Sequence, residues 1–198
     1  MSKMDKRIVV VSRDSLFREG EFTGYKQDGN YIETILREYR LMRRFEAEEN
    51  PAWKQPIPYA VIMNNRGEIY YYVRGSKDYS EKRLAQKGSI GIGGHIDEDD
   101  LKSENFIEEA LRREALEEVM LKPESVEHLG YINLEDTPVS RVHFGIVYLI
   151  RGDVKAHSSE ISLGRMTSLL ELEKLPMEEW SREALKAIKI KMLKENQQ

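Results

Sequence analysis

Cysteine is the residue type that this sequence lacks altogether, since none of its 198 residues is Cys. That absence excludes disulfide bonds, thiolate metal sites and cysteine nucleophiles. Long apolar runs are missing too, because no stretch approaches the roughly 20 apolar residues that a membrane-spanning helix needs. The N-terminal stretch also lacks the apolar core and cleavage site of a secretion signal. We therefore expect no membrane partner and a cytoplasmic location.

An excess of positive charge is absent as well, because the formal net charge is −4. Nucleic-acid affinity comes largely from basic side chains that neutralise phosphates, so we expect no nucleic-acid partner. Four lysines near the C-terminus are expected to lie toward the C-terminal end of a helix, where positive charge complements the helix dipole. They are Lys186, Lys189, Lys191 and Lys194. The apolar content of 40% is enough for the core of one domain spanning residues 1–198.

Local patterns predict strands that alternate with helices. Strands are predicted at Arg7–Val11, Tyr59–Met63, Glu68–Val73, Ser89–Ile92, Val126–Asn133 and Val142–Ile150. Helices are predicted at Tyr31–Ala47, at Glu104–Leu121, and after Pro176 with Trp180, Ala184 and Ile188 on one face. This order indicates an α/β (α+β) fold in which helices cover both sides of a mixed sheet, with an N-terminal strand–helix elaboration at about residues 1–52.

Two turn signals divide these elements. Asn64-Asn65-Arg66-Gly67 lies between two apolar runs and predicts a hairpin. Asn30 and Glu33 are spaced as a capping box at the start of the Tyr31–Ala47 helix. The apolar stripe of that helix is expected to serve as core or as a homodimer contact.

The most informative stretch is Arg113-Glu114-Ala115-Leu116-Glu117-Glu118, which follows the glycine pair Gly93-Gly94. Glu114, Glu117 and Glu118 are spaced i, i+3, i+4, so on a helix they share one face, where like charges repel. Oxygen ligands of this kind bind Mg²⁺, usually together with phosphate oxygens. A metal and diphosphate site is one interpretation, and a solvated acidic helix face is the other.

The segment GGHIDEDDLKSENFIEEALRREALEEVML resembles the Nudix box of MutT-like hydrolases, G-x5-E-x7-R-E-U-x-E-E-x-G-U, where U is aliphatic. Arg113, Glu114, Glu117, Glu118 and Leu121 match its second half residue by residue. The upstream stretches KQPIPYAVI and EKRLAQKGSIGIGGHI look like a branch of predicted MutT-type phosphoesterases. The resemblance implies a Nudix-like α/β/α sandwich.

The sequence departs from the family pattern in three places. Asn105 stands where the family has its first glutamate, and ten residues (95–104) separate it from Gly94 where the family has five. Met120 occupies the position of the family's glycine. Because methionine favours helix and Pro123 cannot continue one, we expect the helix to pass Met120 and to end near Lys122–Glu124.

The resemblance also implies roles for individual residues. Glu114, Glu117 and Glu118, with the Gly94 carbonyl, would ligate Mg²⁺, with Mn²⁺ as an alternative metal. Arg113 would hold a carboxylate of the site by a bidentate bond, or else pair with Glu109 on the helix surface. Glu160 lies in the segment that supplies a general base in many family members, although a solvated loop carboxylate is equally consistent with the sequence.

Four further residues are candidates for binding the substrate phosphates. His95 follows the glycine pair and would contact a phosphate or orient the loop, with a structural role as the alternative. Arg74, Lys77 and Arg83 lie between the hairpin and the glycine turn, where they would either meet phosphates or be solvated. His128 and His143 are expected to be strand residues.

These observations favour a Mg²⁺-dependent hydrolase that cleaves a diphosphate linkage in a small, nucleotide-like substrate. One alternative is a Nudix-like sensor that binds a nucleotide without turnover, and the retention of all three glutamates argues against it. The other alternative is an isomerase of the isopentenyl diphosphate type, whose chemistry relies on a cysteine that this chain lacks.

Overall fold

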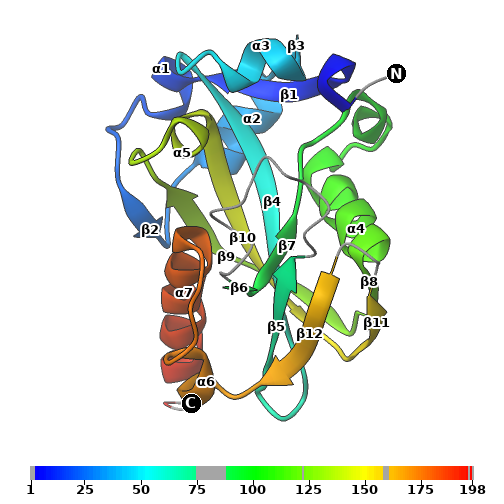
Figure 1. Cartoon of the computed structure of the whole chain (residues 1–198). Helices are drawn as coiled ribbons and strands as arrows, with labels where there is room; N and C mark the ends of the chain where they lie inside the picture. Colours follow the sequence, from blue (N-terminus) through cyan, green and yellow to red (C-terminus); the bar gives the residue numbers. More distant parts are fainter. Residues whose placement is uncertain (1–2, 75–87, 122, 158–160, 196, 198) are drawn as a thin grey trace.

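The computed structural model describes residues 3–74, 88–121, 123–157, 161–195 and 197 (Figure 1). Its strands are β1 (Arg7–Ser12), β2 (Gly24–Lys26), β3 (Arg40–Arg43), β4 (Trp53–Met63), β5 (Ile69–Arg74), β6 (Gly88–Ser89), β7 (Gly91–Gly93), β8 (Val119–Leu121), β9 (Ser125–Asn133), β10 (His143–Arg151), β11 (Val154–His157) and β12 (Ile161–Thr167). Its helices are α1 (Arg13–Leu16), α2 (Tyr31–Glu38), α3 (Arg44–Glu48), α4 (Phe106–Glu118), α5 (Pro138–Val142), α6 (Leu169–Leu172) and α7 (Glu179–Glu195), with short 3-10 helices η1 (Lys3–Asp5) and η3 (Glu98–Lys102).

A mixed sheet organises the molecule, and its main strand order is β12-β5-β4-β10-β9-β2. Strand β10 runs parallel to β4 and antiparallel to β9. Ala60 and Ile62 of β4 pack in the cluster that contains the apolar face of α4, whereas Val61 and Met63 pack with α7. Successive side chains of a strand point to opposite faces, so α4 and α7 cover opposite sides of the sheet, as Figure 1 shows. The expected mixed α/β sandwich is confirmed.

Strand β4 begins earlier than the sequence indicates, because it runs through Pro56 and Pro58. Proline cannot donate a ladder hydrogen bond, which makes it rare within a sheet. On the side of β4 opposite β10, β1 pairs with Trp53 and Lys54, and β7 pairs from Tyr59 onward. The prolines therefore fall in an interval where, among the described strands, only β10 pairs with β4.

The predicted hairpin joins β4 to β5, which pair at Met63 and Ile69. The Asn64 side-chain oxygen accepts hydrogen bonds from the backbone amides of Arg66 and Glu68, each at 3.0 Å. Gly67 adopts φ +75°, a left-handed conformation that glycine permits without strain. The turn is thus encoded locally, and the prediction is confirmed.

The single helix predicted over Tyr31–Ala47 is wrong. It is divided into α2, strand β3 and α3, because residues 40–43 pair with β1 instead of continuing the helix. Asn30 precedes α2 but makes no side-chain capping hydrogen bond, so the predicted capping box is not formed. Of the apolar stripe, Ile35 is fully buried, whereas Leu36 and Phe45 are 37% and 41% exposed.

The predicted end of the acidic helix is also wrong, because α4 ends at Glu118. Val119 has the extended backbone angles φ −138° and ψ 143°, and it opens the short strand β8. That strand pairs with β11, so tertiary pairing overrides the helical preference of Met120 and Leu121. At the other end, the Asn105 side chain accepts a hydrogen bond from the Glu108 amide, so the residue that replaces the family glutamate caps the helix.

Among the described residues, no helix is long and apolar enough to cross a membrane. The final helix, α7, begins at Glu179, and it buries Ala184 and Ile188 against the sheet as predicted.

Candidate active site

The glycine pair at the end of β7, Gly93 and Gly94, forms one wall of the predicted site. A Cβ atom at Gly93 would overlap the carbonyl oxygen of Pro58 in the neighbouring strand β4. A Cβ atom at Gly94 would lie within 2.6 Å of the carboxylate carbon and both carboxylate oxygens of Glu114. Gly93 therefore has no room for a side chain against the backbone of β4, whereas Gly94 leaves the space that the Glu114 carboxylate fills.

Arg113 holds this arrangement together. Its guanidinium donates two hydrogen bonds to Asp100, at 3.0 and 2.9 Å, and one to the backbone oxygen of His95 at 2.9 Å. It donates another to Glu114 Oε1 at 2.6 Å, and Glu117 Oε1 lies 3.7 Å from the same Nη1. Hydrogen bonding to Asp100, which is only 3% exposed, raises the pKa of Arg113 despite the opposing effect of burial. One side chain thus connects η3, the glycine loop and α4.

The three glutamates of α4 differ in their surroundings. Burial raises the pKa of Glu114 above its ordinary value, while the hydrogen bond from Arg113 opposes the shift. Its side chain is 17% exposed, whereas that of Glu117 is 62% exposed. Glu118 is partly buried. The pKa of Tyr70 is raised to about 12, mainly by the burial of Tyr70 itself and also by the negative charge of Glu118.

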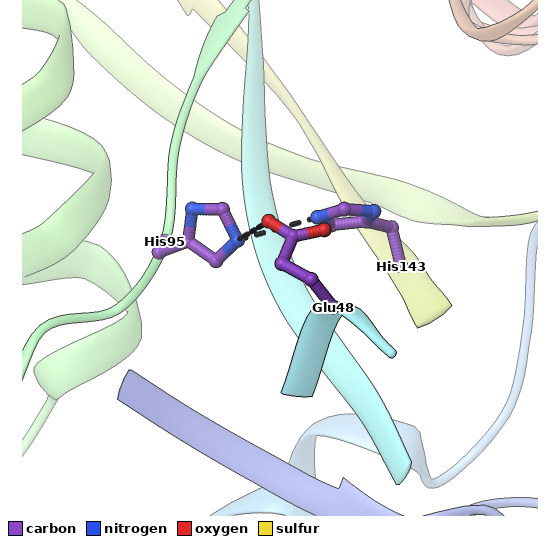
Figure 2. Close-up of side chains that lie close together, drawn as sticks. All are labelled: Glu48, His95 and His143. Carbon is purple, nitrogen blue, oxygen red and sulfur yellow. Dashed lines mark hydrogen bonds and ion pairs between the residues drawn. The ribbon is translucent and has the colours of Figure 1, made fainter. Parts of the chain in front are cut away.

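A second polar cluster lies behind the glycine loop, formed by Glu48, His95 and His143 (Figure 2). Each residue offers a ligand atom, and these three atoms lie within 4.8 Å of one another. In the described part of the chain, this is the one group of at least three His, Asp or Glu residues that meets this criterion. The three α4 glutamates do not meet it, and one oxygen of Glu114 accepts a hydrogen bond from Arg113.

Both imidazoles of this cluster are partly buried, which favours their neutral form. Burial lowers the pKa of His95 well below 6.5, and nearby cations such as Arg44 lower it further. Burial also lowers the pKa of His143. His143 Nδ1 lies 2.7 Å from the Val139 carbonyl oxygen, and because a carbonyl only accepts, Nδ1 carries the proton. The neutral ring therefore has its lone pair on Nε2, the atom that faces His95.

A family model for the NUDIX domain matches residues 53–188 of this chain. The chain belongs to the NUDIX family. The motif Arg113–Glu118, which resembles the second half of a Nudix box, lies within the matched region, and Gly94 precedes it across a loop that contains η3.

Known relatives agree with this assignment. Protein YmaB of Bacillus subtilis (strain 168) is 33% identical over 190 residues, which cover 87% of this chain and 90% of YmaB. The crystal structure of Tm1382, a proposed Nudix hydrolase, is 32% identical with a TM-score of 0.82, covering 92% of this chain and 98% of Tm1382. The NUDIX domain of Shewanella oneidensis NrtR, solved in complex with ADP ribose, is 12% identical with a TM-score of 0.50, covering 70% of this chain and 88% of that one. The last likeness shows the fold alone, and together the findings support a Nudix-type hydrolase.

Not every predicted site residue can be placed. Lys77, Arg83 and Glu160 lie outside the described residues. Arg74 is the last residue of β5, where its backbone pairs with Ile161. Arg113 makes its bidentate bond to Asp100, a residue of the inserted loop, and not to Glu109. Glu114, a member of the acidic triplet, accepts one hydrogen bond from it.

His95, predicted either to contact a substrate phosphate or to orient the loop, lies against other side chains. Its side chain is 12% exposed, and its Nε2 lies 2.7 Å from Gln55 Oε1. In Figure 2 the ring points from the glycine loop toward Glu48 and His143. The alternative structural role at the loop therefore fits His95 better.

Sequence reasoning missed Glu48, Asp100 and the partnership of His95 with His143. The three cluster residues lie almost fifty positions apart along the chain, and no motif spacing connects them. The one available signal was the scarcity of histidine, since two of only four histidines lie in this cluster.

Proposed function

We propose that this Nudix protein is a metal-dependent hydrolase that cleaves the diphosphate linkage of a small nucleoside diphosphate derivative. Glu114, Glu117 and Glu118, with the Gly94 carbonyl, would hold Mg²⁺, or Mn²⁺ as an alternative. Their hard oxygen donors suit these ions better than softer metals. The proposal extends the family assignment to a reaction, a metal and three named ligands.

One observation carries this proposal. The Glu114 carboxylate occupies the space that the missing side chain of Gly94 leaves free, and Arg113 holds it there. A carboxylate that is merely solvated does not need a glycine opposite it or an arginine that is itself fixed by a buried aspartate. This placement therefore favours a positioned ligand over the alternative of a solvated helix face.

Each residue of the site would then have its own task. Arg113 keeps Glu114 oriented and balances its charge before any ligand binds. Glu117, which is largely exposed, is available to a ligand that approaches from solvent. A bound metal supplies charge neutralisation for the diphosphate oxygens and lowers the pKa of an attacking water. Glu160, by its place in the sequence, is the candidate that would accept the proton of this water.

The substrate class is proposed by analogy with one member of the family. The NrtR domain binds ADP ribose, which is a nucleoside diphosphate derivative, and we propose a ligand of the same class here. We propose no nucleic-acid or membrane partner and a cytoplasmic location, because the chain is acidic and carries no long apolar run. The partly exposed residues Leu36 and Phe45 are the places where a homodimer contact would form.

The test is turnover of a panel of nucleoside diphosphate derivatives with Mg²⁺ and with Mn²⁺, read as phosphate after a coupling phosphatase. Glu117→Gln should abolish most turnover, because metal stabilisation of transition-state charge is worth several kcal/mol and each ~1.4 kcal/mol is about tenfold in rate. Its melting temperature should stay the same or rise slightly, since repulsion within the triplet is relieved. Glu109→Gln, on the exposed side of the same helix, is the matched control.

Two results would contradict the proposal. Near-normal turnover by Glu117→Gln would remove that residue from the metal site. A wild-type protein that binds ADP ribose but turns over no member of the panel would favour the sensor alternative instead.

A further inference from the structure

Three segments that are distant in the sequence bring the cluster of Glu48, His95 and His143 together. Glu48 ends α3, which precedes the matched NUDIX region, while His95 follows the glycine pair and His143 begins β10. His95 Nε2 lies 3.2 Å from His143 Nε2 and 3.8 Å from Glu48 Oε1. In Figure 2 the Glu48 carboxylate and the His143 ring both lie next to the His95 ring.

These separations match the spacing of ligand atoms around one small metal ion. Zinc binds histidine nitrogens at about 2.0–2.1 Å in a tetrahedron, so two ligand nitrogens stand about 3.3 Å apart. The observed nitrogen–nitrogen distance of 3.2 Å is close to this value. The Glu48 oxygen lies 3.8 Å from His95 Nε2, and all three ligand atoms lie within 4.8 Å of one another, so the carboxylate must move closer to complete the set.

The surrounding groups orient the cluster as outer-shell partners orient metal ligands. Histidines that bind metals usually donate their other ring N–H to a backbone carbonyl or carboxylate, as His143 Nδ1 does to Val139. Arg44 donates a 3.2 Å hydrogen bond to the Glu48 carboxylate, which keeps it directed at the rings. Lys54 Nζ lies 3.4 Å from the His143 carbonyl oxygen and supports the start of β10.

Gln55 lies beside the cluster and holds the His95 ring. Its side chain is fully buried, and its Oε1 lies 2.7 Å from His95 Nε2. An amide oxygen only accepts hydrogen bonds, so in the metal-free protein the His95 Nε2–H donates this bond. Metal binding through Nε2 therefore requires the other tautomer of His95, with the proton on Nδ1.

We propose that Glu48, His95 and His143 bind one divalent transition-metal ion, for which Zn²⁺ fits best, separate from the Mg²⁺ site on α4. Two imidazoles and one carboxylate are a zinc donor set, whereas Mg²⁺ prefers oxygen ligands alone. The ion joins α3 to the glycine loop and to β10. Because the His95 carbonyl oxygen accepts a hydrogen bond from Arg113, the ion also fixes the loop that faces Glu114.

The test measures bound metal and does not depend on hydrolysis. Purified protein is stripped with a chelator, titrated with Zn²⁺ or Co²⁺, dialysed and analysed for metal by mass spectrometry, with Co²⁺ visible absorption as a second readout. Wild-type protein should retain one equivalent. Zn²⁺ at about a hundredfold excess over Kd should raise its melting temperature by about 5–10 °C.

Substitutions distinguish the histidine cluster from the carboxylates of α4 as the place where the metal binds. Glu48→Gln and His143→Gln should each weaken binding by at least about tenfold, and the cobalt spectrum should change. His128→Gln, an exposed histidine of β9, and Glu117→Gln, in the α4 site, should bind as wild type does. If His143→Gln does not fold, Glu48→Gln decides, because Glu48 is partly exposed.

Three results would overturn the proposal. They are wild-type protein that retains no metal after loading, full retention by Glu48→Gln, and metal loss that follows Glu117→Gln instead. The last result would place the metal on α4. The hydrolase proposal would survive the first two, because its Mg²⁺ ligands lie on α4.

Discussion

Replacing Gly94 by alanine is a direct test of how the glycine loop positions Glu114. The new Cβ atom would lie within 2.6 Å of the carboxylate carbon and both oxygens, whereas ordinary contacts begin at 3.4 Å. The carboxylate must therefore move by about 0.8 Å or more, and it would lose its 2.6 Å hydrogen bond from Arg113. Gly94 is not among the glycines with positive φ, so alanine introduces a clash without backbone strain.

The expected cost in stability is moderate, because the clashing atoms are the end of a side chain and not backbone. An off-rotamer side chain costs about 0.5–1.5 kcal/mol, and a lost hydrogen bond to a charged group about 1.5–3 kcal/mol. Partial relaxation brings the total to about 1–3 kcal/mol, which lowers the melting temperature of a chain of this length by about 2–10 °C. Misplacing a metal ligand by about 1 Å should also cost about a hundredfold in turnover.

A double-mutant cycle isolates the mechanism. In a Glu114→Ala background the clashing carboxylate is gone, so adding Gly94→Ala should cost no more than about 0.5 kcal/mol. Thermal melts of the four proteins in buffer with chelator measure the coupling without any contribution from bound metal. An equal penalty in both backgrounds would refute the reasoning, because the cost would then come from the loop itself.

Two further predictions concern the charged groups that hold the elements together. The pKa of Glu135 is lowered, because hydrogen bonds from two cations, one of them the buried Lys54, outweigh the effect of burial. A lowered pKa means that the pair stabilises the fold above about pH 4.3 and loses this contribution as pH falls further. Glu135→Gln should therefore cost about 1–3 kcal/mol at pH 7 and progressively less below pH 4, and melts across pH 3–7 that show a constant difference would contradict this. Arg113→Lys should destabilise the fold by a similar ~1–3 kcal/mol and reduce turnover, because lysine cannot make the bidentate bond to the buried Asp100. The control, Arg112→Lys, changes an exposed arginine of the same helix and should have little effect. Equal melting temperatures for the two variants would show that the bidentate geometry is unimportant.

The elements that the sequence alone determined are those with local causes. The hairpin at Asn64–Gly67 forms because one asparagine side chain satisfies two turn amides and one glycine supplies the positive φ. Strands β9 and β10 follow from apolar runs bounded by turn residues. The resemblance to a Nudix box could be recognised for the same reason, since Arg113–Glu118 lie close together on one helix.

Tertiary structure decided every feature that depends on a distant partner. The stripe that looked like one helix broke at residues 40–43 because β1 offers a strand to pair with, and α4 stopped at Glu118 because β11 pairs with the residues that follow. Helical periodicity predicts which face of a segment is apolar, but it does not predict which element packs against that face. The bidentate bond of Arg113 to Asp100 and the meeting of the His95 and His143 rings are contacts of this kind. Such contacts arise only when the sheet places separate loops side by side, and no spacing along the chain encodes them.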